Sequence, residues 1–250
     1  MEKELYLESA EIEAKHWWFV GRRAILLDTL MRFSGASHNK LLDIGCGTGL
    51  NAMLFSVNGF LVTGLETSAV AIGLARAIAP SINILATSFP SSLVARDSYA
   101  VITALDVIEH IDDDKGMIRA VADALQPRGL VLISVPAFSF LWSVHDELAH
   151  HKRRYNREEL SACLVTAGLE PIFISYFNFF LFPLIALFRV MSAVFGISRN
   201  VSDFSATPKI LNSALASIFA AERFLLRIFP LPVGVSLIAV GRKNKYFAAT

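Results

Sequence analysis

The segment that most constrains this chain of 250 residues is a glycine run after a short apolar stretch. Residues 40–44 read KLLDI, a pattern typical of a buried strand, and Gly45, Gly47 and Gly49 follow at alternate positions. Glycine has no Cβ, so this spacing lets the backbone turn sharply and approach a ligand closely. Asp43 stands just before the run. The pattern predicts a nucleotide-like ligand site where a strand ends and a helix begins.

Strand and helix patterns alternate after the glycine run. Apolar strand candidates lie at 61–66, 82–86, 99–105 and 129–135, and helical patterns lie at 49–57, 68–79, 114–125 and 157–167. This order predicts one α/β domain with a doubly wound, mostly parallel sheet. Residues 126–129, which read QPRG, predict a turn that ends one helix and leads into the next strand. Two further strands are expected at 172–176 and 235–241.

The bulk composition excludes several classes of protein. The formal net charge of +1 provides no field that would attract nucleic acid. Cys46 and Cys163 are the only cysteines, which excludes a disulfide framework and suits the reducing cytosol. Residues 1–4 read MEKE and lack the basic start of a secretory signal, so we expect a cytoplasmic protein. The hydrophobic content of 54% exceeds the roughly 45–50% of ordinary soluble domains, which indicates an apolar feature beyond the core.

A second acidic residue, Glu66, ends the next strand candidate. A carboxylate at that position can accept hydrogen bonds from both hydroxyls of a ribose. A dinucleotide-binding G-x-G-x-x-G pattern starting at Gly45 would require glycine at position 50, where Leu50 stands, so a nicotinamide or flavin cofactor is disfavoured. A glycine turn that serves only packing remains the alternative, but it does not explain Glu66.

Four segments in order resemble one enzyme superfamily. DIGCGTG at 43–49, VTGLE ending at Glu66, ALDVIEHI at 104–111 and LQPRGLVLISVP at 125–136 are similar to the motifs of class I S-adenosylmethionine-dependent methyltransferases. The resemblance covers about residues 38–177 and the last strand. It implies a seven-stranded sheet whose final strand is antiparallel, with S-adenosylmethionine above the carboxyl ends of the strands.

The resemblance also implies residue roles. Asp43 and the glycine loop would hold the methionine moiety, Glu66 the ribose, and residues 106–110 would border cofactor and substrate. Many members carry an acid after the third strand for the adenine amine, where this chain has Thr87 and Ser88 as weaker candidates. The cofactor-binding residues expected on this basis are Asp43, Gly45, Cys46, Gly47, Gly49, Glu66, Thr67, Thr87, Ser88, Asp106 and Val107.

Methyl transfer from a sulfonium is an in-line displacement, so alignment supplies most of the catalysis and we expect no metal. An oxygen or nitrogen nucleophile still benefits from a base, and histidine suits neutral pH. We predict His145, with Asp146 beside it, and His110 as the catalytic residues. A metal held by His145, Asp146 and His150 and a merely solvated loop are the alternatives for this segment. For Glu109 and His110 the alternative is a capping and packing pair.

The polar segment at 142–155 follows the fifth strand and should face the substrate. The expected substrate-binding residues are Trp142, His150, Arg154 and Tyr155. Arg153, Arg154 and Arg157 suit a phosphate or carboxylate group, because guanidinium forks bind such oxyanions. Basic residues that only aid solubility would give the same pattern.

The remaining segments define a domain plan. We expect a helical cap at 1–35, a cofactor-binding core at 36–177 and 234–243, and an apolar helical insertion at 178–233. Residues 171–188 carry no charge, but Asn178 and Pro183 interrupt them and they do not reach the ~20 residues of a membrane span. The amphipathic helix at 209–229 is interrupted by charged residues. The insertion is therefore interpreted as a lid, a dimer surface or a membrane-interface anchor.

Together these observations predict a cytoplasmic methyltransferase, either free or at the inner face of the membrane. The expected acceptor is an oxygen, and secondarily a nitrogen or carbon, of a hydrophobic or lipid-like small molecule. A homodimer is a further expectation, and nucleic acid is not an expected partner. The alternative from another class is a catalytically silent methyltransferase-like scaffold whose insertion recruits a partner or a membrane.

Overall fold

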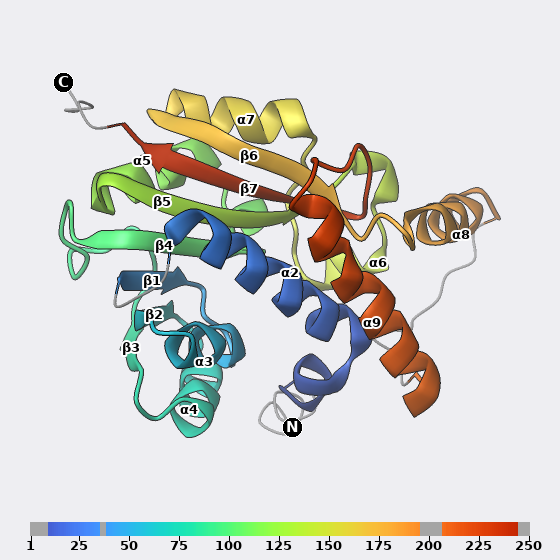
Figure 1. The fold of residues 1–250 in the computed structure, drawn as a ribbon, viewed down its shortest axis with the longest axis horizontal. Helices are drawn as coiled ribbons and strands as arrows, with labels where there is room; N and C mark the ends of the chain where they lie inside the picture. Colours follow the sequence, from blue (N-terminus) through green and yellow to red (C-terminus); the bar gives the residue numbers. More distant parts are fainter. Residues whose placement is uncertain (1–9, 36–38, 196–206, 245–250) are drawn as a thin grey trace.

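A seven-stranded sheet forms the centre of the molecule in the computed structural model, which describes residues 10–35, 39–195 and 207–244. The strand order is β3-β2-β1-β4-β5-β7-β6, with helices on both faces (Figure 1). The strands are β1 (Lys40–Ile44), β2 (Leu61–Glu66), β3 (Asn83–Ala86), β4 (Tyr99–Leu105), β5 (Leu125–Pro136), β6 (Leu169–Phe177) and β7 (Ser236–Lys243). Neighbouring strands are parallel, except that β7 runs antiparallel to both β5 and β6. The predicted fold class is confirmed.

The helices lie close to their predicted positions. They are α2 (Trp17–Ser34), α3 (Leu50–Val57), α4 (Ala69–Ile78), α5 (Asp114–Ala124), α6 (Val144–Leu148), α7 (Arg157–Thr166), α8 (Phe182–Phe195) and α9 (Lys209–Leu226), with short 3₁₀ turns η1 (Ile108–His110) and η2 (Ser139–Leu141). Residues 10–15 form a further helical segment before α2. Local capping explains two of the helix starts. The Ser68 hydroxyl accepts from the Ala71 N–H at α4, and Asn156 and Glu159 form a reciprocal capping box at α7.

Both faces of the sheet are buried, which explains the nearly continuous apolar runs of the central strands. Along β5, Val131, Ile133 and Val135 belong to one core layer and Leu130 and Leu132 to the other, because successive strand side chains alternate. The first layer is completed by α5 and α7, and the second by α2, α3, α4 and α9. The helix α2 is therefore a full member of the core.

One local prediction needs correction. Residues 126–129 do not form a turn before the strand, because β5 already begins at Leu125. The irregular backbone there appears as a register shift against β4 and as a positive φ of 66° at Arg128. The uncharged run at 171–188 is interrupted near Asn178, as expected. It is divided between β6 and α8, with Asn178 at a positive φ of 58° after the end of the strand.

The helix α9 packs along α2, so the insertion and the amino-terminal helices share one core (Figure 1). Phe219 of α9 is fully buried, and its ring centroid lies 5.3 Å from that of Trp18 and 6.0 Å from that of Phe177. A Cβ at Gly21 would fall 2.6 Å from the Phe219 ring, so only glycine allows this approach of the two helices. Asn212 of α9 accepts from the Trp17 N–H at 2.8 Å, which fixes the start of α2.

The division into cap, core and insertion stays a prediction. Within the described ranges no helix is both long and apolar enough to cross a membrane. Residues 1–9 of the predicted helical cap and residues 196–206 of the predicted insertion lie outside the described residues.

Replacing Phe219 with alanine should lower the free energy of unfolding by about 3–5 kcal/mol, because it removes a fully buried aromatic ring and leaves a cavity between α2 and α9. Ile210→Ala is the matched control on the same helix, since Ile210 is 88% exposed, and it should change the value by less than ~0.5 kcal/mol. Urea unfolding followed by circular dichroism measures both. Equal losses in the two variants would contradict the packing of α9 on α2.

Candidate active site

The glycine loop between β1 and α3 has a backbone that other residues would strain. Gly45, Gly47 and Gly49 have φ values of 65°, 53° and 83°. A Cβ at Gly45 would fall 2.9 Å from a methyl group of Val107, and one at Gly49 would fall 3.0 Å from the backbone of Ala75. The loop therefore packs tightly against the end of β4 and against α4.

Glu66 at the end of β2 faces this loop. Its carboxylate accepts hydrogen bonds from the backbone N–H groups of Gly47 (3.0 Å), Thr67 (2.8 Å) and Ser68 (2.9 Å). The residue thus joins the glycine loop to the start of α4. Thr87 and Ser88 follow β3 at the same edge of the sheet, where the Thr87 hydroxyl lies 3.2 Å from that of Ser91. The ligand contacts assigned to these residues stay predictions.

Asp43 lies at the floor of the site and is 2% exposed. One carboxylate oxygen accepts from the Thr103 hydroxyl at 2.6 Å, and the other has no hydrogen-bond partner among the described residues. Burial raises the pKa of Asp43 to about 7, although the Thr103 hydrogen bond acts in the opposite direction. A buried acceptor without a partner is a position where a donor group of a ligand would be favourable.

Cys46 can offer a ligand only its backbone. The thiol is buried, and a Cβ at Gly64 would fall 2.7 Å from its sulfur, so it fills the core beneath β2. Burial also raises the pKa of the thiol. The predicted role of Cys46 is therefore narrowed to its main chain, because its side chain serves packing.

Asp106 follows β4 with a positive φ of 57°, and its carboxylate is held from the far side by Arg22 of α2. An Arg22 Nη lies 2.7 Å from Asp106 and 2.9 Å from the Ser134 hydroxyl, which donates to Asp106 at 2.9 Å. Arg22 is only 4% exposed, whereas the Asp106 side chain is 39% exposed. Sequence reasoning missed Arg22, although a charged residue within the apolar stripe of Ile25 and Leu26 was a usable signal.

The helical segment at 10–15 lies against the glycine loop. The Thr48 hydroxyl donates to the Glu13 carboxylate at 2.5 Å. Arg23 donates to the Glu13 carbonyl oxygen at 2.7 Å, which ties the segment to α2. Residues 10–15 thus border the candidate cofactor site.

Three histidines converge at the same edge of the sheet. The His151 ring centroid lies 4.7 Å from that of His110 and 5.9 Å from that of His145. His151 Nδ1 lies 2.8 Å from a carboxylate oxygen of Asp146. The predicted catalytic residues His145, Asp146 and His110 are therefore brought together, but around His151. Sequence reasoning missed His151 because it adjoins His150 and the sequence offers no basis for choosing between them.

Asp146 is fully buried, and its carboxylate accepts several hydrogen bonds. It accepts hydrogen bonds from Arg154 through Nε and Nη2, both at 2.8 Å, and from the Ser143 N–H at 2.8 Å. Burial alone would raise the pKa of Asp146, but the bonds from His151 and Arg154 hold it well below its usual value. Asp146 therefore remains ionised and orients its partners, and its catalytic role beside His145 stays a prediction.

Burial disfavours the substrate roles predicted for Arg154 and Tyr155. Arg154 is 6% exposed, with its guanidinium bonded to Asp146 and to the Ala137 carbonyl oxygen. Tyr155 is 3% exposed and donates its hydroxyl to Asp114 at 2.8 Å. Arg153 and Arg157 likewise bond to the protein, Arg153 to Asp112 and Asp114, Arg157 to the Leu231 carbonyl oxygen. These basic residues hold the loop together and present no free oxyanion site.

Glu109 is fully buried beside the histidines, and neither of its carboxyl oxygens has a hydrogen-bond partner among the described residues. Burial, and then the charge of Asp106, raise its pKa well above the usual value. Burial, and then the His151 ring, lower the pKa of His110. Glu109, His110 and His151 place metal-ligand atoms within 4.8 Å of one another, so the expectation of a reaction without metal stays a prediction.

An aromatic cluster gathers around η2, after the end of β5. Phe138 stacks on Tyr176 with ring centroids 4.7 Å apart and lies 5.3 Å from Phe140 and 6.0 Å from Phe182. Phe140 and Trp142 are 56% and 37% exposed. Trp142 and the exposed His150 stay predictions as substrate-binding residues, since both are accessible at this edge.

Comparison with known proteins agrees with this geometry. Residues 19–172 match the family model described as a methyltransferase domain, so the chain belongs to that family, within the class I S-adenosylmethionine-dependent methyltransferases. The expected superfamily and its cofactor, S-adenosylmethionine, are thereby confirmed.

Curated relatives and solved structures add detail. The ubiquinone biosynthesis O-methyltransferase of Aeromonas salmonicida is 29% identical over 138 residues, which cover 50% of this chain and 58% of the relative. That of Bordetella bronchiseptica is 27% identical over 197 residues, 66% of this chain and 82% of the relative. A chain from the complex of the Haloferax volcanii Trm112 methyltransferase activator with a methyltransferase has a TM-score of 0.65 at 16% identity, covering 98% of this chain and 96% of that one. An S-adenosylmethionine-dependent methyltransferase from Mesorhizobium loti has a TM-score of 0.56 at 16% identity, covering 83% and 92%. The structural likenesses show the fold.

Glu66→Ala should weaken S-adenosylmethionine binding about 10- to 100-fold, because a carboxylate hydrogen-bonded to the ligand and loop would be lost. Glu170→Ala, at an exposed position of β6, is the control and should bind as the unaltered chain does. Isothermal titration calorimetry measures both, after thermal unfolding has shown that the variants are folded. Undiminished affinity in Glu66→Ala would remove Glu66 from the cofactor site.

Asp43→Asn tests the electrostatics of the floor. Because the pKa of Asp43 is raised from 3.8 to about 7, the folded chain keeps a proton that the unfolded chain releases, so stability falls as the pH rises through this window. The stability of the variant relative to the unaltered chain should therefore increase by about 3 kcal/mol between pH ~4.5 and pH ~8. Urea unfolding without cofactor measures this difference, with Glu170→Gln as the control. If the stability difference between the variant and the unaltered chain did not change with pH, Asp43 would not be a buried carboxyl group with a raised pKa.

Proposed function

We propose that this chain transfers the methyl group of S-adenosylmethionine to a hydroxyl oxygen of a hydrophobic small molecule, with His151 as the general base. The observation that carries the proposal is the Asp146–His151 pair. A carboxylate oxygen of Asp146 lies 2.8 Å from His151 Nδ1, at the same edge of the sheet as the glycine loop. An ionised carboxylate at Nδ1 favours the tautomer that protonates Nδ1 and leaves Nε2 as the acceptor.

The chain of contacts from the cofactor loop to this base is short. Val107 contacts Gly45, and Glu109, two residues further on, lies 4.0 Å from His151 Nε2. The Lys152 N–H also donates to the Glu109 carbonyl oxygen at 2.8 Å. This bond fixes the polar segment at 142–155, called the histidine loop below, against η1. A base held at this point can accept the hydroxyl proton while the oxygen attacks the methyl carbon. The bond from that carbon to sulfur breaks, and the sulfonium leaves as a neutral thioether.

Oxygen as the acceptor atom is supported by the relatives, which are named O-methyltransferases. The match spans 58% of the length of the Aeromonas salmonicida relative, so the pathway of that relative is not transferred to this chain. The His151 side chain is 8% exposed, so little water reaches the ring.

A hydrophobic acceptor is supported by the surroundings of the histidines. The stacked pair Phe138 and Tyr176 and the exposed Phe140 provide flat apolar surface on one side. The arginines that could have bound an anionic substrate are bonded to protein groups. The site therefore favours ring or chain contacts over a phosphate or carboxylate.

His151→Gln should lower kcat about 100-fold or more and leave the affinity for S-adenosylmethionine unchanged, because the variant loses the proton acceptor and no cofactor contact. His145→Gln is the matched control, since His145 lies in the same cluster, with its ring centroid 5.9 Å from that of His151. Transfer of labelled methyl groups to a panel of alkyl- or prenyl-bearing phenols and alcohols measures the rate. A loss confined to His145→Gln would move the base to His145.

Two further experiments distinguish a general base from a metal site and an enzyme from a silent scaffold. Activity that survives chelation by EDTA supports a base, whereas loss on chelation with recovery on adding a divalent cation would assign Glu109, His110 and His151 to a metal. Calorimetric cofactor binding without methyl transfer to any acceptor would instead favour the silent scaffold.

A further inference from the structure

The helix α9 has two apolar faces, and only one of them is covered by the rest of the chain. Ala216, Phe219 and Leu226 are buried against α2 and the sheet. The opposite stripe remains exposed along the whole helix and just beyond its end. Its large side chains are Ile210 (88%), Leu211 (51%), Ile218 (44%), Phe224 (53%) and Ile228 (76%).

The charges on α9 have one sign at the surface. Lys209 begins the helix and Arg223 lies in its last turn, while its only acidic residue, Glu222, is fully buried. The Glu222 carboxylate accepts from the Phe180 N–H at 3.0 Å, so it serves the loop before α8. Neither Lys209 nor Arg223 has a carboxylate partner among the described residues. The exposed stripe is thus apolar, with cations at its two ends and no acid.

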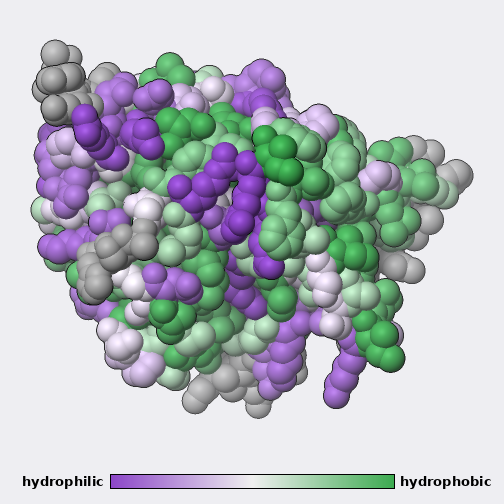
Figure 2. Space-filling model, viewed as in Figure 1, coloured by the Kyte–Doolittle hydropathy of each residue, from purple (hydrophilic) through white to green (hydrophobic). Residues whose placement is uncertain are grey.

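The neighbouring helix α8 repeats this pattern. Leu184, Leu187, Phe188 and Met191 are 46–69% exposed, and Arg189 is the only charged residue of the helix. Arg189 donates to the Leu141 carbonyl oxygen at 2.6 Å, which connects α8 to η2 at the mouth of the candidate active site. Figure 2 shows apolar surface over α8 and over the amino end of α9, at the same end of the molecule.

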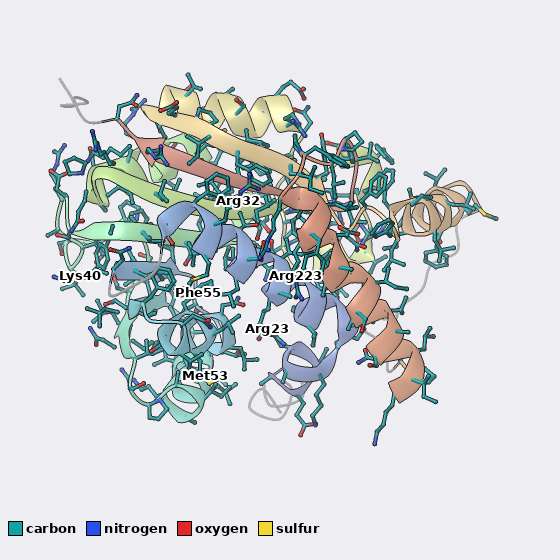
Figure 3. All side chains as sticks on the ribbon, in the orientation of Figure 1. Arg23, Arg32, Lys40, Met53, Phe55 and Arg223 are labelled. Atoms are coloured by element: carbon teal, nitrogen blue, oxygen red, sulfur yellow. The ribbon has the colours of Figure 1, made fainter. Side chains whose placement is uncertain are left out.

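A hollow of about 640 Å³ between α2, α3 and α9 adds a basic wall next to the exposed stripe. It is lined by Arg23 and Arg223 (Figure 3), by Arg227, and by apolar side chains that include Leu27 and Phe224. Asp28 is the only acid in the lining and forms an ion pair with Arg227. The hollow therefore combines surplus guanidinium groups with an apolar wall, which suits a phosphate joined to a hydrocarbon chain.

We propose that the exposed faces of α8 and α9 dock on an anionic phospholipid bilayer, with the apolar side chains in the interface and Lys209 and Arg223 on lipid phosphates. Interfacial helices have this composition: an apolar face, cations at its border and too little length or hydropathy to span. Long basic side chains can keep their heads at the phosphate level while their stems lie along apolar groups. A second copy of the chain would place like charges opposite each other, so charge complementarity favours the bilayer.

The docking surface also explains the route of the acceptor, and this step rests on the proposed function. The helix α8 joins the surface to η2, and Phe182 of α8 lies 6.0 Å from Phe138 in the aromatic cluster. An acceptor dissolved in the bilayer could pass along these rings to His151 without entering water. The partner that delivers the substrate would then be the membrane itself.

Flotation of the full chain with vesicles tests the docking without cofactor or acceptor. One set of vesicles contains equal parts of phosphatidylcholine and phosphatidylglycerol, and the other contains phosphatidylcholine alone. We expect the chain to float with the anionic vesicles, to bind the neutral ones more weakly, and to lose binding at ~0.5 M salt because the phosphate contacts are screened.

Two variants test the surface itself. Lys209→Gln with Arg223→Gln should lower the partition into anionic vesicles about 25-fold, since each cation near such a surface contributes a few-fold. Ile210→Ser, Ile218→Ser and Phe224→Ser in one chain should lower it more than tenfold on both vesicle types. The matched control replaces Val57, Leu61 and Leu93, which are 73%, 55% and 63% exposed elsewhere on the molecule, by serine. Circular dichroism shows whether each variant is folded, and the charge variant carries the test if the apolar one is not.

The outcomes distinguish a bilayer from a second copy of the chain as the partner of this surface. An unaltered chain that binds neither vesicle overturns the proposal, as does equal binding by all variants. If sedimentation velocity shows a dimer that the apolar variant dissociates, the face is an interface between copies of this chain and the bilayer is excluded as its partner. Vesicle binding without methyl transfer would overturn only the proposed function, and transfer to a detergent-dissolved acceptor without vesicle binding would overturn only the docking.

Discussion

The position of β7 between β5 and β6 determines where most other parts of the molecule can lie. β7 is hydrogen-bonded to both neighbours in antiparallel register, and Ser236, its first residue, stands opposite both Pro136 and Phe177. Because Phe177 ends β6, the chain between β6 and β7 must leave and return at one point. That point is the carboxyl end of β5, where the histidine loop also begins. The insertion and the candidate active site are therefore neighbours for a topological reason.

Charged groups at this edge are buried, and a few partners keep them in place. Arg154 neutralises Asp146 and Arg22 neutralises Asp106, while Asp43 relies on the Thr103 hydroxyl. A buried charge without a partner is costly, so these pairs fix the loops around the site more firmly than exposed ion pairs could. The Asp43 and Glu109 carboxyl groups keep oxygens without a hydrogen-bond partner among the described residues. Those atoms are the places where a bound ligand gains most from a donor.

The two faces of α9 have different roles, one in the stability of the domain and the other in docking. One face completes the core against α2, so the insertion contributes to the stability of the whole domain instead of folding apart from it. The other face carries apolar side chains that burial within the described chain does not explain. A helix held rigidly on the inside and left apolar on the outside presents a fixed surface, which suits docking on a flat partner better than closing over a ligand.

The local pattern of the sequence was sufficient for the sheet, the helices and the cofactor class. Strand periodicity, the glycine loop before Leu50 and the acid at Glu66 are short-range signals, because strand ends and turns depend on neighbouring residues. The histidine site was only half predictable. His110 and His145 were placed at the correct edge, but His151, Arg22 and Thr103 acquire their roles from residues distant in the chain. Arg154 and Tyr155 have the residue types of a substrate site, and only burial shows that they bond to the protein. Tertiary structure decided these roles because the direction and exposure of a side chain depend on what packs around it.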